Sequence, residues 1–329
     1  MSGMDTRIIR PRSFAPLWQK PGTWLSPSPS FCFLPRKGGE ICTAPAISTH
    51  AILPKNRIHG ADDLKDWFNR ILQVAVDIWM ALVPRRRPGR EAVARCRIVS
   101  HRGEHGDNRT ARENTLAAFY AARAAGVWGI ETDIRWTADL VPVLSHDPDT
   151  QRIFGKPVTI AGVSFAELRA AVPQIPSLAE LVAAFGGGTH LMLELKAETF
   201  PDLERQKEIL REHLAGLEPG GDYHVLALDP ELFETFDIEP RSCCLSVAQD
   251  NMAAIHARTL GSAYGGITGH YVLLDDAIKH AHEAEGRKVG TGFVASRNCL
   301  YREINRGVEW IFSNDAVALQ KVVNQLSEA

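Results

Sequence analysis

The chain has 329 residues, of which 45% are hydrophobic and 23% are charged, which is ordinary for a globular protein and sufficient for one large core or two small ones. Its 37 basic and 39 acidic residues give a net charge of -2, so no global field attracts nucleic acid, and we expect no nucleic-acid partner. No run of about 18 to 20 apolar residues is present to span a bilayer, and no secretory signal peptide is evident, which predicts a cytoplasmic protein.

The first 60 residues have the composition of a disordered segment. They contain eight prolines, eight basic residues and only two acidic ones, without apolar periodicity of a helix or a strand. Such a segment cannot form a packed core by itself. We therefore predict a disordered N-terminal extension over residues 1–60.

An amphipathic helix and a basic linker are predicted for residues 61–96. Apolar residues recur at helical spacing from Asp62 to Val83, Pro84 ends the pattern, and four arginines follow within residues 85–90. Two alternatives stay open for this helix. Either it packs against the next domain, or residues 62–90 make peripheral contact with an anionic membrane surface, which would make the protein membrane-associated.

From residue 97 to the C-terminus, β-branched or apolar runs alternate with helical patterns, which is typical of β/α units around a parallel sheet. The expected strands are 97–100, 129–135, 190–196, 224–228, 243–247, 265–268, 288–294 and 310–314. The expected helices are 113–125, 177–185, 201–215, 230–236, 250–260, 275–285, 297–306 and 315–327. Eight pairs in about 235 residues predict an α/β fold, a TIM (β/α)8 barrel over residues 97–329 with an N-terminal helical extension. A doubly wound open sheet is the alternative, but no Gly-rich turn follows the first strand.

Carboxylates lie on two of the expected strands. Glu131 and Asp133 are two residues apart, as are Glu194 and Lys196, so the members of each pair lie on one side of their strand. We expect that side to face the mouth of the barrel. Three carboxylates gathered there would repel one another unless a cation neutralised them, and ligands that offer only oxygen favour Mg²⁺ or Ca²⁺.

Two histidines and two cations are expected beside this metal site. His101 ends the first strand and His146 follows the extended run 141–144, and both are suited to acid and base roles at neutral pH. Arg102 and Lys196 are suited to a phosphate group. Together they indicate a phosphodiester substrate, in which one histidine deprotonates the attacking hydroxyl and the other protonates the leaving group. The residues alone do not assign the two roles.

A series of motifs in chain order resembles the glycerophosphodiester phosphodiesterase family. The motifs are HRG at 101–103, ENTLAAF at 113–119, GIETDIR at 129–135, PVLSHD at 142–147, RIFG at 152–155, LELK at 193–196 and GVEWIFSND at 307–315. The resemblance covers roughly residues 97–320. It implies a TIM barrel that hydrolyses glycerophosphodiesters to glycerol phosphate and an alcohol, a phosphoric diester hydrolase whose partner is a small-molecule diester. It also implies that His101 and His146 form the acid-base pair, that Glu131, Asp133 and Glu194 bind Mg²⁺ or Ca²⁺, and that Arg102 and Lys196 bind phosphate.

Two departures from the family pattern concern the substrate pocket. The loop 104–112 is longer and more charged than is usual in the family. Around the seventh strand the family commonly has a tryptophan, whereas this chain has the run GTGF at 290–293, so Phe293 is expected to supply the apolar wall. Glu113 is a second candidate for the pocket, although helix capping would also explain it.

Four further polar residues near the strand ends, Asp147, His105, His270 and Asp315, are expected to be solvated loop residues. His190 precedes its strand and is expected at the opposite end of the barrel, where it would affect only stability.

Two other functions fit the same residues less well. A phospholipid-cleaving lyase similar to sphingomyelinase D, which forms a cyclic phosphate, would agree with the amphipathic helix. A non-catalytic phosphate-binding barrel is disfavoured because no expected polar residue is missing. The sequence does not distinguish water from a substrate hydroxyl as the attacking group.

Overall fold

A computed structural model describes residues 61–328 of the chain, with side chains from residue 72 onward. The prediction for residues 1–60 lies outside the described residues. Two helices precede the first strand, α1 (Ala61–Leu82) and α2 (Arg90–Arg95). The amphipathic helix expected near residues 62–83 is therefore present.

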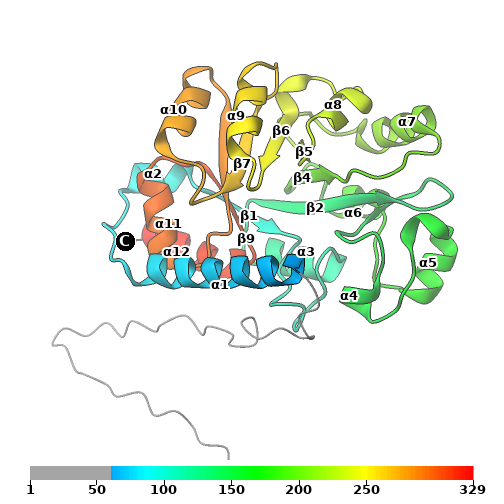
Figure 1. Cartoon of the computed structure of the whole chain (residues 1–329), viewed down its shortest axis with the longest axis horizontal. Coiled ribbons are helices and arrows are strands. Elements are labelled where there is room, and N and C mark those ends of the chain that lie inside the picture. The colour runs from blue at the N-terminus through cyan, green and yellow to red at the C-terminus, as the bar shows by residue number, and fades with distance from the viewer. Residues whose placement is uncertain (1–60, 329) are drawn as a thin grey trace, which may run out of the picture. The chain divides into compact units, whose positions relative to one another are not determined.

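Eight parallel strands form a closed barrel (Figure 1). They are β1 (Arg97–His101), β2 (Gly129–Trp136), β4 (His190–Leu195), β5 (Tyr223–Ala227), β6 (Cys244–Ala248), β7 (Gly266–His270), β8 (Lys288–Gly292) and β9 (Trp310–Ser313). Neighbours in this series pair with each other, and β1 pairs with both β2 and β9, which closes the ring. The predicted TIM barrel is confirmed, and each expected strand has a counterpart.

Each expected helix also has a counterpart. They are α3 (Leu116–Ala124), α6 (Leu178–Phe185), α7 (Leu203–Leu214), α8 (Glu231–Thr235), α9 (Met252–Leu260), α10 (Asp276–Ala284), α11 (Arg297–Asn305) and α12 (Ala316–Glu328). Several begin at a residue whose side chain accepts a hydrogen bond from the first turn, as Thr115 does for α3 and Ser177 for α6. Such caps satisfy backbone donors that have no partner within the helix.

The segment between β2 and α6 contains the expected extended run 141–144 and further elements that the sequence pattern did not predict. A short strand, β3 (Pro142–Leu144), pairs antiparallel with the end of β2. It is followed by α4 (Gln151–Phe154), a 3-10 turn η2 (Ile160–Gly162) and α5 (Phe165–Ala171). The segment has a small core of its own, formed by Val143, Ile160, Leu168, Val172 and Ile175. We call residues 142–177 the β2–α6 insertion.

The interior of the barrel changes from apolar to polar along the strands. An apolar layer fills the middle, formed by Val99, Met192, Leu226, Leu245, Trp310 and Phe312. On β1, Val99 precedes His101 by two residues, and on β4, Met192 precedes Glu194 by two. Because side chains two apart on a strand share a face, the polar groups lie directly above the apolar layer, at the C-terminal mouth.

A pair of histidines lies at the opposite, N-terminal end. His190 Nδ1 donates to the carbonyl of Gly221 (2.9 Å), so its Nε2 accepts from Nδ1–H of His224 (2.8 Å). The ring of Trp128 stacks on His190 with centroids 4.3 Å apart. The expected position of His190, away from the mouth, is confirmed.

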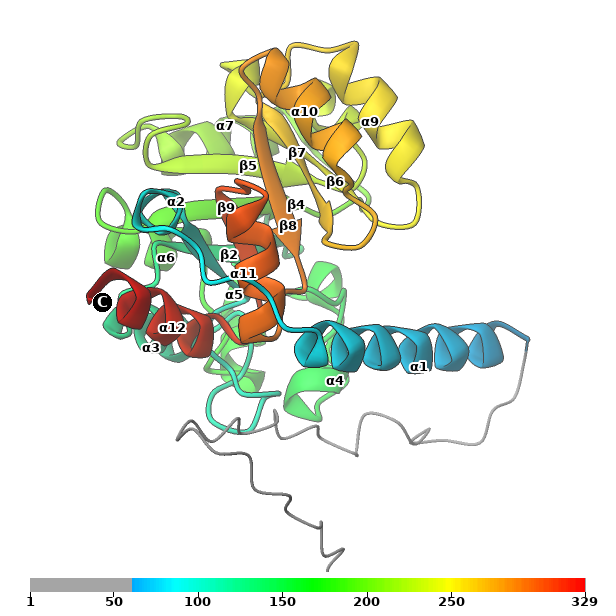
Figure 2. The ribbon, with the colours of Figure 1, turned by 90° about the vertical axis from the view of Figure 1, so that its left-hand side faces the viewer.

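The C-terminal part of helix α1 packs against α11, and the N-terminal part extends beyond it (Figure 2). Val76 and Met80 contact the main hydrophobic core, Tyr271 Oη donates to Asp77 Oδ1 (2.7 Å), and Asn298 Nδ2 donates to the carbonyl of Ala81 (2.6 Å). The first of the two alternatives for this helix, packing against the next domain, is thus present in the structure. Within residues 61–328, no helix is long and apolar enough to cross a bilayer.

Protonation of the buried pair His190 and His224 should destabilise the barrel in acid. Burial lowers the pKa of His190 to about 4 and that of His224 to about 3, whereas a histidine in an unfolded chain titrates near about 6.5. Between these values the unfolded chain binds protons that the folded barrel does not, so stability falls as the pH drops through about 6.5. Asparagine at position 224 can keep the hydrogen bond to His190 but does not titrate. Between pH 6.5 and 4.5, the unfolding free energy of His224→Asn should therefore fall by about 2 kcal/mol less than that of the wild type.

Urea unfolding at the two pH values measures this effect. The control is His280→Asn, because His280 is exposed on α10. A pH dependence that stays the same in His224→Asn would contradict the prediction.

Candidate active site

Three buried carboxylates face one another at the mouth of the barrel. Glu131 and Asp133 lie on β2 and Glu194 lies opposite Asp133 on β4, and one oxygen from each falls within 4.8 Å of the others. Burial and the neighbouring charges of Asp133 and Glu194 raise the pKa of Glu131 well above its usual range. Burial and Asp133 likewise raise the pKa of Glu194. The sequence prediction that these three side chains converge agrees with the structure.

Two cations contact this cluster. Lys196 Nζ lies 2.6 Å from Asp133 Oδ1 and also bonds Glu194. Arg102 Nε lies 3.3 Å from Asp133 Oδ2, and its backbone N–H donates to Glu131 Oε2 (3.0 Å). Burial alone would raise the pKa of Asp133, but Lys196 and Arg102 outweigh it and hold that pKa below its usual range. Asp133 is therefore fully compensated, whereas Glu131 is not.

The uncompensated oxygen fits a metal ion. Glu131 Oε1 is buried and has no hydrogen-bond partner among the described residues. A buried carboxylate oxygen without a partner is costly, and a cation held by Glu131, Asp133 and Glu194 would satisfy it. Ligands that offer only oxygen suit a hard divalent ion.

His101 points its free nitrogen at the cluster. Its Nδ1 lies 2.7 Å from Asn314 Oδ1, and because an amide oxygen accepts, Nδ1 carries the proton. The lone pair on Nε2 then faces Glu131, with 3.8 Å between Nε2 and Oε2. Burial and the charge of Arg102 lower the pKa of His101 to about 4. Asn314 was not among the predicted site residues, although it directly follows β9 at the mouth.

His146 is held by a carboxylate and an arginine. Its Nδ1 lies 2.7 Å from Asp147 Oδ1, and its backbone carbonyl accepts from Arg135 Nε (2.9 Å) and Nη2 (2.7 Å). Arg135 in turn pairs with Glu198 at 2.8 Å. The expectation that Asp147 is a solvated loop residue was wrong, because Asp147 is half-buried and pairs with both His146 and Arg152. Arg135 was detectable, since it lies two residues after Asp133 on the same face of β2.

Glu113 holds arginines and does not cap α3. Its carboxylate bonds Arg102 Nη1 (3.0 Å) and Arg152 Nη2 (2.7 Å), and α3 is capped by Thr115. The neighbouring Asn114 Nδ2 donates to Asp133 Oδ2 (2.8 Å). Glu113 therefore supports the predicted phosphate-binding Arg102.

Phe293 lies at the mouth, next to the imidazole rings of His101 and His270. Its side chain is 51% exposed, and its φ of 66° is unusual for a bulky residue. The ring lies edge-on to His101 (centroids 6.0 Å apart) and stacks on His270 (5.4 Å). His270 ends β7 and accepts from the backbone N–H of Val272 (3.1 Å), so it is an ordered, half-buried residue.

Of the other residues expected to be solvated, Asp315 is exposed but His105 is buried. The loop that carries His105 folds back on α3, where the backbone N–H of Glu104 donates to the carbonyl of Ala118 (3.0 Å). Sequence reasoning gave no sign of this fold-back, because the loop is short of apolar residues.

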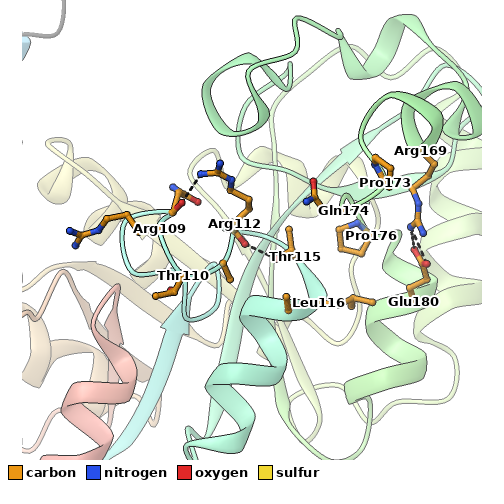
Figure 3. Close-up of a pocket in the computed structure, with 13 residues that line it drawn as sticks. Arg109, Thr110, Arg112, Thr115, Leu116, Arg169, Pro173, Gln174, Pro176 and Glu180 are labelled. Atoms are coloured by element: carbon orange, nitrogen blue, oxygen red, sulfur yellow. Dashed lines mark hydrogen bonds and ion pairs between the residues drawn. The ribbon is translucent and has the colours of Figure 1, made fainter. Parts of the chain in front are cut away.

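Two cavities flank the mouth. One of about 360 Å³ is lined by residues that include Arg135, His146 and Lys196. A larger one of about 490 Å³ lies beside the loop 104–112 and is lined by residues that include Arg112 and Arg169 (Figure 3). The larger cavity contains none of the predicted site residues, so we place the candidate site at the strand ends.

The chain resembles known proteins over part of its length. Residues 101–236 match the Glycerophosphoryl diester phosphodiesterase family. Glycerophosphodiester phosphodiesterase 1 of Bos taurus is 30% identical over 146 residues, which cover 40% of this chain and 43% of that protein. Lysophospholipase D GDPD1 of Rattus norvegicus is 31% identical over 139 residues, which cover 36% of this chain and 43% of that protein. The chain thus spans less than half the length of these curated relatives.

Solved structures share the fold. A phosphodiesterase of Oleispira antarctica in complex with the product sn-glycerol-3-phosphate has a TM-score of 0.60 and 22% identity, and the match covers 71% of this chain and 99% of that chain. A glycerophosphodiester phosphodiesterase of Thermotoga maritima has a TM-score of 0.59 and 19% identity, with 69% and 98% covered.

Glu131→Gln should separate the destabilising effect of a buried charge from the contribution of that charge to ion binding. The change removes a charge that lacks a partner, so we expect the metal-free variant to unfold at a higher temperature than the metal-free wild type. Mg²⁺ or Ca²⁺ at about 100 times its dissociation constant should stabilise the wild type by about 2.7 kcal/mol and the variant much less. Thermal unfolding with and without the ion measures both. Glu208→Gln, at an exposed position on α7, is the control, and an ion-dependent shift in Glu131→Gln as large as in wild type would exclude the site.

Proposed function

We propose that this protein hydrolyses glycerophosphodiesters to glycerol phosphate and an alcohol, because residues 101–236 match the glycerophosphoryl diester phosphodiesterase family. One observation carries the proposal. The three buried carboxylates, the two cations and the two imidazoles meet at one end of a closed barrel, as the positions of Glu131, Arg102 and His101 illustrate. A phosphodiester is the substrate that needs all three kinds of group at once.

The charged groups have separate roles in this proposal. Glu131, Asp133 and Glu194 would hold Mg²⁺ or Ca²⁺, and the ion would offset negative charge on the phosphodiester oxygens. Arg102 and Lys196 lie within 3.3 Å of Asp133, so a phosphate bound beside the carboxylates meets positive charge from the chain as well.

The partners of the two histidines support different roles for them. His101 donates to the neutral amide of Asn314, which leaves Nε2 free to accept a proton. His146 pairs with the carboxylate of Asp147, which stabilises a protonated imidazole. We therefore assign His101 as the base and His146 as the acid.

The reaction then balances in a single displacement. With water as the attacking group, the water oxygen forms a bond to phosphorus and gives its proton to His101 Nε2. The bond from phosphorus to the alcohol oxygen breaks, and that oxygen takes the proton from His146 Nε2. The products are glycerol phosphate and the alcohol.

Activity on glycerophosphocholine should require the ion and both imidazoles. We expect EDTA to abolish the release of glycerol phosphate, and His101→Ala or His146→Ala to lower kcat by about 100-fold to 10,000-fold. His280→Ala is the control, because His280 is exposed on α10. Full activity in EDTA or in His101→Ala would refute the proposal, and a cyclic phosphate that persists in phosphorus NMR would indicate the lyase instead.

We also propose that α1 contacts an anionic membrane. Leu72, Ala75, Trp79 and Leu82 follow one another at helical spacing and are all exposed, Trp79 at 66% and Leu82 at 67%. These four residues, which we call the outer stripe, lie on the helix face that does not pack on the barrel. An exposed apolar stripe on a helix is typical of binding to a lipid interface.

Charge at the end of α1 favours the same partner. Arg86, Arg87 and Arg90 are exposed, and none forms an ion pair within residues 61–328. Tyr271, which bonds α1, is followed in the loop after β7 by the exposed Val272 and Leu273. Helix α1 is therefore bonded to the loop that follows β7, on the side of the barrel where a lipid-linked diester would arrive, and one relative is named a lysophospholipase D.

Membrane binding should depend on both features of α1. We expect Trp79→Glu with Leu82→Glu, or Arg86→Glu with Arg87→Glu, to lower the affinity for anionic vesicles about tenfold or more, since each arginine near such a surface contributes about 1 kcal/mol. Vesicle sedimentation of the full chain, with neutral vesicles in parallel, measures this. Tyr120→Ser, at an exposed aromatic position on α3, is the control. Equal sedimentation of all variants would refute membrane contact.

A further inference from the structure

Arg152 connects the two halves of the proposed site. It lies on α4 in the β2–α6 insertion, and its guanidinium contacts two carboxylates. Nε lies 2.5 Å from Asp147 Oδ2, while Nη2 lies 2.7 Å from Glu113 Oε1 and Nη1 lies 3.2 Å from Glu113 Oε2. A planar guanidinium can hold two carboxylates in fixed directions in this way, whereas an ammonium cannot.

Each of these carboxylates continues to a group that acts on the substrate. Asp147 accepts from His146 Nδ1 at 2.7 Å, and Glu113 accepts from Arg102 Nη1 at 3.0 Å. The contacts thus form an unbroken series from His146 through Asp147, Arg152 and Glu113 to Arg102. The two ends of the series, Arg102 and His146, are 44 positions apart in the sequence.

The charges in this series are stable. Burial would raise the pKa of Glu113, but hydrogen bonds from Arg152 and Asn108 lower it to about 2. The pKa of Asp147 is also below its usual range, because bonds from Arg152 and His146 outweigh its burial. Both carboxylates therefore stay ionised and hold Arg152 between them at neutral pH.

We propose that Arg152 is a positioning residue for proton donation. Through Asp147 it orients the His146 imidazole toward the leaving alcohol oxygen, and through Glu113 it keeps that imidazole in place relative to the phosphate held by Arg102. Arg152 itself is 47% exposed and does not touch the three buried carboxylates, so it acts through its partners. Without Arg152, Asp147 loses the bond that fixes its second oxygen, and the imidazole is free to turn with it. The inference rests on the proposed function, because it presumes that His146 gives a proton to the leaving group.

The choice of leaving group tests this role. Choline leaves as a poorly acidic alcohol and needs a proton, whereas 4-nitrophenol leaves readily as its anion. We compare glycerophosphocholine with glyceryl 4-nitrophenyl phosphate in the full chain with Mg²⁺. Arg152→Gln is expected to lower kcat for the choline diester by about 10-fold to 100-fold and for the nitrophenyl diester by less than about threefold.

Two further variants define the mechanism. Asp147→Asn should show the same dependence on the leaving group, and the double variant should be no slower than about the slower single variant, because both act through one imidazole. Arg205→Gln is the control, since Arg205 on α7 is likewise 47% exposed and pairs with two carboxylates, those of Glu208 and Glu212. It should leave both rates unchanged.

The outcomes separate this inference from the proposed function. If Arg152→Gln slows both diesters equally, or slows neither, the positioning role is wrong while the hydrolase proposal stands. If the wild type hydrolyses neither diester, the proposed function fails and the inference fails with it.

Discussion

The mouth of the barrel is organised around negative charge that is buried and only partly compensated. Glu131, Asp133 and Glu194 approach one another within 4.8 Å in a place that water hardly reaches. Such a cluster is unfavourable unless cations meet it, and Lys196 and Arg102 supply part of that charge. The remainder is the physical reason for expecting a divalent ion, and it fixes where a phosphate can bind.

A second arrangement of charges surrounds the first and ties the insertion to the barrel. Arg102 pairs with Glu113, Glu113 also pairs with Arg152, and Arg152 also pairs with Asp147. Each charge has a partner of opposite sign on either side, so the removal of one leaves another unsatisfied. The β2–α6 insertion is therefore more than a connection, because it brings Arg152 to a position that the barrel alone does not provide.

Histidines show how strongly the environment decides the chemistry of one residue type. At the N-terminal end, His190 and His224 bond each other between aromatic rings and stay neutral by burial. At the mouth, His101 bonds an amide and His146 bonds a carboxylate. The first pair can only affect stability, whereas the second pair presents a free Nε2 on each ring and is suited to proton transfer.

The sequence by itself determined the barrel and the residues at its mouth. Alternating apolar runs mark each strand, and spacing by two puts Glu131 beside Asp133, because local chain geometry decides both features. Only the tertiary structure decided the partners of those residues. Arg152 and Asn314 reach the site by contacts between distant segments, and Arg152 then holds Asp147. The exposed face of α1 depends on which face packs on the barrel. Such contacts follow from packing, which no local pattern encodes.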